Sequence, residues 1–279
     1  MRQITPEVIS RFKDHLIVEE KSDNTVEKYI RDISFFMDWL MGRELTKVVA
    51  LEYKKHLCQR SAPASVNAAI SSLNSFFAFM EWHDMRMKAL KIQKQIFAER
   101  DKELTKEEYE RLLMAAKSKK NERLYYLMQT ICSSGIRVSE LSEITVESVK
   151  NRRANINCKG KMRVVILPKE LCRMLTNYAK VQKITSGPVF VTKTGKPLDR
   201  STIWKMMKAL CKSAGVERKK VFPHNLRHLF ARTYYSIQKD IVRLADILGH
   251  TSINTTRIYT MEAGDVHRRQ IQRLGLLLL

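Results

Sequence analysis

The sequence predicts a mainly helical protein of two domains, with one small β-sheet in the second domain. Apolar residues recur with a period of about 3.6 through the first 82 residues and again after residue 105, as in amphipathic helices. The polar stretch between these regions, residues 92–104, favours a linker. Over residues 153–167 the apolar residues alternate instead, as in a β-hairpin. A chain of 279 residues is long enough to bury two cores.

The first domain, residues 1–92, is expected to be a bundle of four helices. Thr5 is followed by proline and caps the first helix, and the second helix runs to Leu40. The third helix is expected over residues 46–57 and the fourth over residues 64–82. The aromatic side chains of the fourth helix have the spacing of a helix core, so they favour packing over the stacking of bases.

The second domain, residues 105–279, follows a linker over residues 93–104. Thr105 and Glu108 form a capping box that begins its first helix. Further elements are predicted in this order: helices over 106–117 and 121–132, a helix near Val138, the hairpin over 153–167, and a second short strand pair around 189–191 and 195–197 that extends the sheet.

The charge of the chain predicts a polyanionic partner. The sequence has 51 Lys and Arg against 29 Asp and Glu, a formal net charge of +22. Residues 1–98 contribute +3 of it and residues 99–279 contribute +19. A basic surface that only confers solubility is the alternative, but it needs less charge than this. A nucleic acid is therefore the expected partner of the second domain.

The cysteines and the apolar segments indicate a cytoplasmic protein. The five cysteines are an odd number and form no CxxC pair, which favours reduced thiols. No apolar run approaches about 18 residues, so neither export nor a membrane span is expected. With a nucleic acid as partner, the predicted location is the nucleoid.

Six residues of the second domain can form one phosphate-handling site that ends in a nucleophile. They are Arg137 in GIRVSEL, Lys159 in CKGKMR, His224 and Arg227 in HNLRHLFA, and His250 and Tyr259 in LGHTSINTTRIY. Residues three apart on a helix share a face, so His224 and Arg227 can approach the same phosphate. Gly249 is expected to end a helix in a left-handed cap and to leave His250 in the turn.

Each of these residues also has a plainer interpretation. A lone arginine or a basic hairpin tip is usually solvated, and a lone tyrosine is usually structural. His224 and His228 have a spacing that metal sites use, but HNLRH lacks the glutamate of HExxH and no acidic cluster is near. We therefore predict no metal and no cofactor.

The order and contexts of the six motifs resemble those of the tyrosine recombinases, the family of Cre, lambda integrase and the Xer proteins. The resemblance covers nearly the whole chain. It implies an N-terminal four-helix core-binding (SAM-like) domain and a C-terminal mixed α/β catalytic domain. It also implies site-specific recombination through a 3′-phosphotyrosyl intermediate and a Holliday junction, without metal or ATP, as an integrase or resolvase of a mobile element or chromosome.

The resemblance assigns a role to each matching residue. Arg137, Arg227 and His250 would bind the phosphate, Tyr259 would attack it, His224 would take the tyrosine proton and Lys159 would be the general acid. Lys161 competes with Lys159, because the hairpin is shorter than the family's usual GKGxKxR form. The supporting residues would be Glu140, which orients Arg137, and His228. The DNA-binding set would be Ser65, Asn67, Ser71, Lys161 and Arg163. Helix capping or a solvated face explains the three residues of the first domain equally well.

The resemblance also implies an assembly. The expected partner is DNA with inverted-repeat core sites, bound by a homo-tetramer on two duplexes or a hetero-tetramer with a related recombinase. The apolar tail from Val266 onward would dock into a neighbouring protomer, with folding back on its own domain as the alternative. A type IB topoisomerase, a non-catalytic DNA-binding protein of this fold and a purely structural helical protein are the other functions considered.

Overall fold

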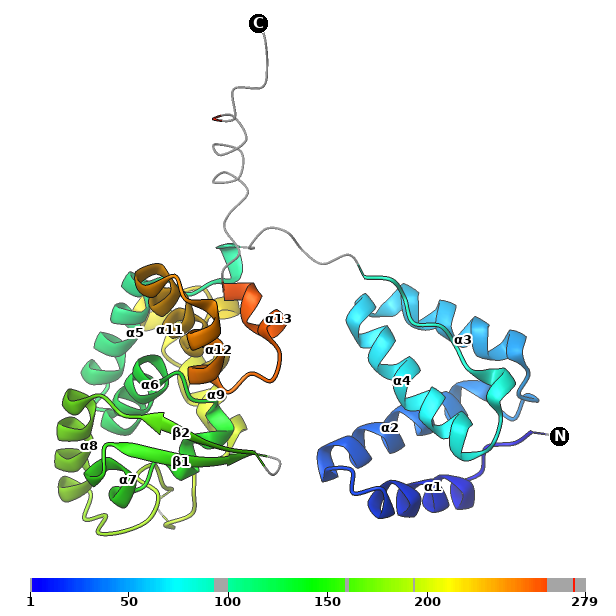
Figure 1. The fold of residues 1–279 in the computed structure, drawn as a ribbon, viewed down its shortest axis with the longest axis horizontal. Coiled ribbons are helices and arrows are strands. Elements are labelled where there is room, and N and C mark those ends of the chain that lie inside the picture. The colour runs from blue at the N-terminus through cyan, green and yellow to red at the C-terminus, as the bar shows by residue number, and fades with distance from the viewer. Residues whose placement is uncertain (1, 93–99, 159–160, 193, 260–272, 274–279) are drawn as a thin grey trace, which may run out of the picture. The chain divides into compact units, whose positions relative to one another are not determined.

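The computed structural model divides into two compact units, Met1–Lys94 and Gln95–Leu279 (Figure 1). It describes residues 2–92, 100–158, 161–192, 194–259 and 273, with the backbone alone at Arg100, Cys158 and Lys161. The division between the units lies inside the stretch expected to be a linker, and each unit has its own apolar core.

The N-terminal unit contains the four expected helices. They are α1 (Pro6–Val18), α2 (Asp23–Leu40), α3 (Lys47–Arg60) and α4 (Pro63–Phe79), followed by the 3-10 turn η1 (His83–Met85). Thr5 caps α1 by accepting a hydrogen bond from Val8 N. The fourth helix ends three residues before the predicted end, because Glu81 has a left-handed backbone with φ of 59°.

Aromatic rings fill the core of this unit. Phe12, Phe36, Phe76 and Phe77 are each 0–1% exposed, and the rings of Phe12 and Phe76 meet edge to face at 5.3 Å. The packing interpretation of the α4 aromatics is therefore correct for Phe76 and Phe77.

The C-terminal unit is a larger assembly of helices with a single hairpin. Its longer elements are α5 (Lys106–Ser118), α6 (Glu122–Ser134), β1 (Arg153–Cys158), β2 (Lys161–Ile166), α8 (Lys169–Val181), α9 (Arg200–Lys208), α11 (Pro223–Gln238) and α12 (Ile241–Leu248). Its short elements are η2 (Arg100–Lys102), η3 (Val138–Glu143), α7 (Val146–Lys150), α10 (Cys211–Ala214), η4 (Arg218–Lys220), α13 (Ile253–Thr256) and η5 (Arg257–Tyr259). The predicted capping box of Thr105 and Glu108 begins α5.

The sheet is smaller than expected. Strands β1 and β2 pair antiparallel, from Arg153 opposite Ile166 to Cys158 opposite Lys161, and within the described residues the sheet has these two strands. The predicted second strand pair is wrong, because it forms only isolated bridges at Pro188 and Pro197. Proline has no N–H group to donate to a ladder, so pairing stops at these positions.

Helix α6 packs against α5, α8 and α11 of the C-terminal unit. The end of the predicted linker joins the same core: Leu104 is fully buried, and its carbonyl accepts a hydrogen bond from Arg232 Nη2 at 2.6 Å. Residues 102–104 are thus part of the second unit. In the described part of the chain, no helix is both long and apolar enough to cross a membrane.

Candidate active site

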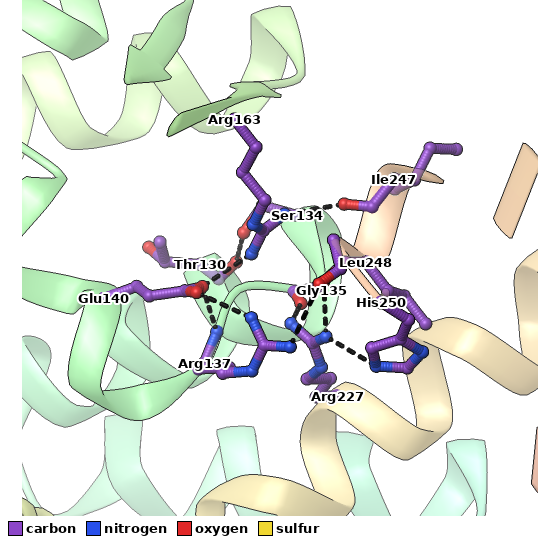
Figure 2. Close-up of polar contacts among 11 residues, drawn as sticks. Thr130, Ser134, Gly135, Arg137, Glu140, Arg163, Arg227, Ile247, Leu248 and His250 are labelled. Carbon is purple, nitrogen blue, oxygen red and sulfur yellow. Dashed lines mark hydrogen bonds and ion pairs between the residues drawn. The ribbon is translucent and has the colours of Figure 1, made fainter. Parts of the chain in front are cut away.

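Four segments of the C-terminal unit meet at one polar cluster (Figure 2). They are the turn after α6, strand β2, the first turns of α11, and the segment from the end of α12 to His250. Three of these segments contribute an arginine: Arg137, Arg163 and Arg227.

The turn after α6 depends on Gly135. Its φ of 67° is left-handed, and a Cβ atom at this position would lie 2.5 Å from the Phe230 ring. The turn also directs the Gly135 carbonyl towards α11, where it accepts a hydrogen bond from Arg227 Nη1 at 2.5 Å. Gly135 therefore lets the turn after α6 and helix α11 approach each other closely.

Arg137 caps η3 and is held by Glu140. Its main-chain N–H donates to Glu140 Oε2 at 2.8 Å, and its Nη1 donates to Oε1 at 2.9 Å. The predicted orienting role of Glu140 agrees with this geometry. Burial opposes ionisation of Glu140, which is 3% exposed, but the Arg137 N–H and the Arg163 and Arg137 guanidinium groups hold its pKa below the usual value. Glu140 thus stays charged, and the Arg137 side chain remains 34% exposed.

Arg163 was expected to bind DNA, and in the structure its guanidinium has partners within the protein instead. Its Nη2 donates to Glu140 Oε2 at 2.6 Å and its Nη1 donates to the Ile247 carbonyl at 2.6 Å, so the guanidinium joins η3 to α12 (Figure 2). The reason is that side chains alternate between the two faces of a strand. Met162 and Val164 face outward and are 75% and 59% exposed, whereas Arg163 lies on the inward face with Val165, two residues further along β2.

Arg227 is the most deeply buried charge of the site, with 1% of its surface exposed. Its Nη2 donates to the Leu248 carbonyl at 2.7 Å and to His250 Nε2 at 3.1 Å, and the side chain also bonds the Tyr259 hydroxyl. Burial and the charge of Arg137 lower its pKa to about 10, so it remains a cation at neutral pH.

His224 and His228 lie on the same face of α11, one turn apart. The His224 ring is exposed and meets the His228 ring at 4.4 Å, and His228 in turn meets the edge of the Tyr259 ring at 5.0 Å. Partial desolvation and the charges of Arg227, Arg137 and Arg200 lower the pKa of His224. A neutral His224 can accept a proton. Burial is the main cause that lowers the pKa of His228 to about 3, and its Nε2 has no partner.

His250 follows the left-handed cap at Gly249, as predicted, where φ is 63°. Its Nδ1 lies 2.8 Å from Thr256 Oγ1, and its Nε2 faces Arg227. Burial and the charges of Arg227, Arg137 and Arg163 lower its pKa to about 4. His250 is therefore neutral at physiological pH.

Tyr259 lies at the end of η5 and is 4% exposed. Its ring is stacked on the His250 ring with centroids 6.1 Å apart and 18° between planes. Burial raises the pKa of the phenol, while the charge and hydrogen bond of Arg227 and the charge of Arg137 act in the opposite direction. Deprotonation of this tyrosine consequently requires a base or the charge of the surrounding arginines.

The structure brings together five of the six predicted site residues, with His224 joined to the others through His228. Lys159 lies outside the described residues, and so does the side chain of Lys161. The cluster combines three guanidinium groups with one carboxylate. This excess of positive charge in a largely buried place favours an anion.

The three expected DNA contacts of the first domain lie on α4 and differ in their surroundings. Ser65 and Ser71 are exposed. Asn67 has a structural task, because its amide donates to the Leu90 carbonyl at 2.9 Å and accepts from Leu90 N at 2.7 Å. These two bonds hold the chain that leaves the bundle against α4.

The sequence interpretation missed the partners that hold the site residues. Thr256 binds His250, and the carbonyls of Gly135 and Leu248 bind Arg227. The polar Thr256, six residues after His250 in LGHTSINTTRIY, could have indicated the first of these contacts. The contacts of main-chain carbonyls cannot be read from a sequence, because every residue has a carbonyl group. Among the described side chains, no group of three or more His, Cys, Asp or Glu is placed to hold a metal ion.

Two protein-family models match this chain. Residues 102–264 match the model of the phage integrase family, and residues 9–84 match the phage integrase N-terminal SAM-like domain. The chain belongs to the phage integrase family. It is 31% identical over 283 residues to the tyrosine recombinase XerA of Thermococcus kodakarensis, a match that covers 98% of this chain and 96% of the relative. The tyrosine recombinase XerA of Pyrococcus furiosus is 29% identical, with 99% and 96% covered.

Solved structures share the fold. A crystal structure of XerA recombinase, 28% identical, covers 98% of this chain and 99% of its own with a TM-score of 0.53. The lambda integrase(75-356) dimer bound to a COC′ core site, at 18% identity, covers 93% and 96% with a TM-score of 0.74. The architecture of a SAM-like domain followed by a catalytic domain is therefore that of lambda integrase.

Proposed function

We propose that the protein is a site-specific DNA recombinase that breaks and rejoins strands through Tyr259. The observation that carries the proposal is the placement of the Tyr259 ring against the His250 ring, beside Arg227 and in the cluster that also holds Arg137. A nucleophile thus lies beside the groups suited to bind the phosphate that it attacks. The names of the relatives, and the DNA core sites named for several structural neighbours, support the same function.

The chemistry follows from these placements. Attack of Tyr259 Oη on phosphorus adds negative charge to the non-bridging oxygens, and Arg137 and Arg227 supply charged donors for them. His224, with its lowered pKa, takes the phenol proton. The bond from phosphorus to the 5′ oxygen breaks, and Lys159 protonates that oxygen.

The product of this step is a 3′-phosphotyrosyl enzyme with a free 5′-hydroxyl. Attack by the 5′-hydroxyl of a second duplex reverses the chemistry, restores Tyr259 and passes through a Holliday junction. The phosphodiester energy is kept in the covalent bond, so the reaction needs no ATP. The arginines supply the positive charge that a metal ion supplies in other phosphoryl transfers, so it needs no metal.

The proposed substrate is a pair of duplexes with inverted-repeat core sites. Four protomers, identical or shared with a related recombinase, would hold them, and the segment from Val266 onward would dock into a neighbour. Ser65 and Ser71 would contact phosphates from the N-terminal unit, and Lys161 would do so from the hairpin. The protein would work at the nucleoid in the cytoplasm.

A covalent-capture experiment tests the proposal without a known site. The protein is incubated with a pool of nicked duplexes whose two arms are randomised, and DNA that stays on the protein in denaturing detergent is amplified and sequenced. We expect inverted-repeat arms to be enriched with the wild type and no adduct with Tyr259→Phe, which removes only the hydroxyl. An adduct of Tyr259→Phe, or loss of the wild-type adduct in EDTA, would contradict the mechanism.

Assays on the selected DNA site then distinguish recombination from the relaxation of supercoils. A recombinase joins arms from two different duplexes, so products of a new length should appear in a gel. A type IB topoisomerase would relax a supercoiled plasmid and yield no such product. A DNA-binding protein of this fold without catalysis would form no adduct at all.

A further inference from the structure

Thr256 carries a buried hydroxyl group that the proposed chemistry does not use. The residue is at the end of α13 and is 0% exposed. Its Oγ1 lies 2.8 Å from His250 Nδ1. It is three residues before Tyr259, so it links the phosphate-binding histidine to the segment that carries the nucleophile.

The two contacts of the His250 ring determine which nitrogen carries the proton. Nε2 lies 3.1 Å from Arg227 Nη2. A guanidinium group has only donors, so Nε2 must be the acceptor and has no hydrogen. The ring is neutral at physiological pH, because burial and the nearby arginines disfavour its cation. The single proton is therefore on Nδ1, and Thr256 Oγ1 accepts it.

This tautomer is the wrong one for catalysis. The inference rests on the proposed function, in which His250 donates a hydrogen bond to a non-bridging phosphate oxygen. Nε2 is the nitrogen that faces Arg227, the residue proposed to bind that phosphate, and Nε2 carries no hydrogen in the free protein. His250 can donate from Nε2 only after its proton has moved there from Nδ1.

We propose that Thr256 is a positioning residue that holds His250 in both tautomers. A threonine hydroxyl is one donor and two acceptors, so it can accept from Nδ1–H and, after rotation about the Cβ–Oγ bond, donate to a bare Nδ1. In the DNA complex the phosphate oxygen replaces the Arg227 N–H opposite Nε2. Water then accepts the Nδ1 proton and supplies a proton to Nε2, so the ring stays neutral and no proton is gained or lost overall.

The hydrogen bond between Thr256 and His250 also helps to fix the position of Tyr259. The His250 ring is stacked on the Tyr259 ring, and Thr256 holds that histidine from the segment that leads to Tyr259. A His250 ring held by Thr256 therefore cannot turn without disturbing the position of Tyr259. Valine has nearly the shape of threonine but no hydroxyl, and serine keeps the hydroxyl, so this pair of substitutions separates the hydrogen bond from packing.

The first test reads the tautomer directly by NMR of protein labelled with ¹⁵N-histidine at neutral pH. His250 signals are assigned by their loss in His250→Gln. We expect the proton on Nδ1 in the free protein and on Nε2 when Tyr259→Phe is bound to the nicked duplex selected by covalent capture. A proton on Nε2 in the free protein, or on both nitrogens in the complex, would overturn the proposal.

The second test measures single-turnover cleavage of the same duplex. Thr256→Val should form the Tyr259 adduct about tenfold more slowly or worse, and Thr256→Ser should stay within a few-fold of the wild type. In a His250→Phe background, Thr256→Val should add no further slowing, because Thr256 acts through His250.

Equal slowing in both backgrounds would mean that Thr256 has only a structural role, and the proposal would fail while the recombinase function stood. If the wild type forms no adduct, the proposed function itself fails. If Thr256→Val does not fold, the NMR comparison alone tests the proposal. It compares the His250 tautomer in the free wild-type protein with the tautomer in the Tyr259→Phe complex.

Discussion

Replacement of Gly249 by alanine should destabilise the catalytic unit far more than its backbone conformation alone explains. Gly249 ends α12 with φ of 63°, where an L side chain costs about 1 kcal/mol. A Cβ atom there would also lie 2.3 Å from Arg163 Cδ and 2.7 Å from its Nε. Arg163 would have to leave its place.

The cost of moving Arg163 follows from its contacts. The guanidinium would lose its bonds to Glu140 and to the Ile247 carbonyl, both at 2.6 Å. A hydrogen bond to a charged group contributes about 1.5–3 kcal/mol, and Glu140 would stay buried with Arg137 as its remaining charged partner. Together with the backbone term, we expect Gly249→Ala to reduce the free energy of unfolding by about 3–5 kcal/mol.

Gly215 is the matched control. It ends α10 with φ of 60°, but a Cβ atom there would meet nothing within 4 Å. Gly215→Ala should therefore cost only the backbone term, about 1 kcal/mol. Urea unfolding can be followed by Trp204 fluorescence in a background in which Trp39 and Trp82 are phenylalanine, so that the signal reports the catalytic unit.

A double-mutant cycle identifies the cause. In an Arg163→Ala background the collision is absent, so Gly249→Ala should cost no more than Gly215→Ala does. If Gly249→Ala and Gly215→Ala are equally mild in the presence of Arg163, the bridge from η3 to α12 contributes no stability and the reasoning is refuted. Because Glu140 positions Arg137, the same variant should also slow formation of the Tyr259 adduct.

Three further predictions follow from the site and from the proposed assembly. Lys159→Ala should cleave normal DNA slowly but recover on a substrate with sulfur at the 5′ bridging position, because a thiolate leaves without protonation; rescue of Lys161→Ala instead would transfer the general-acid role. Between pH 6.5 and 4 the catalytic unit should lose stability, because the unfolded chain protonates histidines whose folded pKa values are about 3 for His228 and about 4 for His250. Each of these histidines adds at most about 1.4 kcal/mol per pH unit to the slope of the unfolding free energy against pH. His228→Phe should therefore reduce this slope in urea unfolding, and an unchanged slope would contradict the burial of a neutral His228. Deletion from Val266 onward should leave binding to one half-site but abolish cooperative binding to a full site, and unchanged cooperativity in a gel-shift titration would reject tail exchange.

Local sequence signals predicted most of the secondary structure and the residues that we propose for the site. The caps at Thr5, Thr105 and Gly249 are where the sequence placed them, because a cap is made by side chains and backbone within a few residues. The spacing of His224 and Arg227 on one helix was readable for the same reason. The predicted second strand pair does not form, because Pro188 and Pro197 have no N–H group to continue a ladder.

What each arginine contacts was decided only by the tertiary structure. Arg163 and Arg137 both lie close to a glycine in the sequence. The Arg163 side chain is 15% exposed and bridges η3 to α12, whereas the Arg137 side chain is 34% exposed. Their common partner Glu140 is 23 residues from Arg163 and three from Arg137, and the carbonyls that bind Arg227 come from positions 135 and 248. A sequence shows which side chains carry charge, but burial and hydrogen bonding depend on which distant segments the fold brings together, so these roles appeared only with the structure.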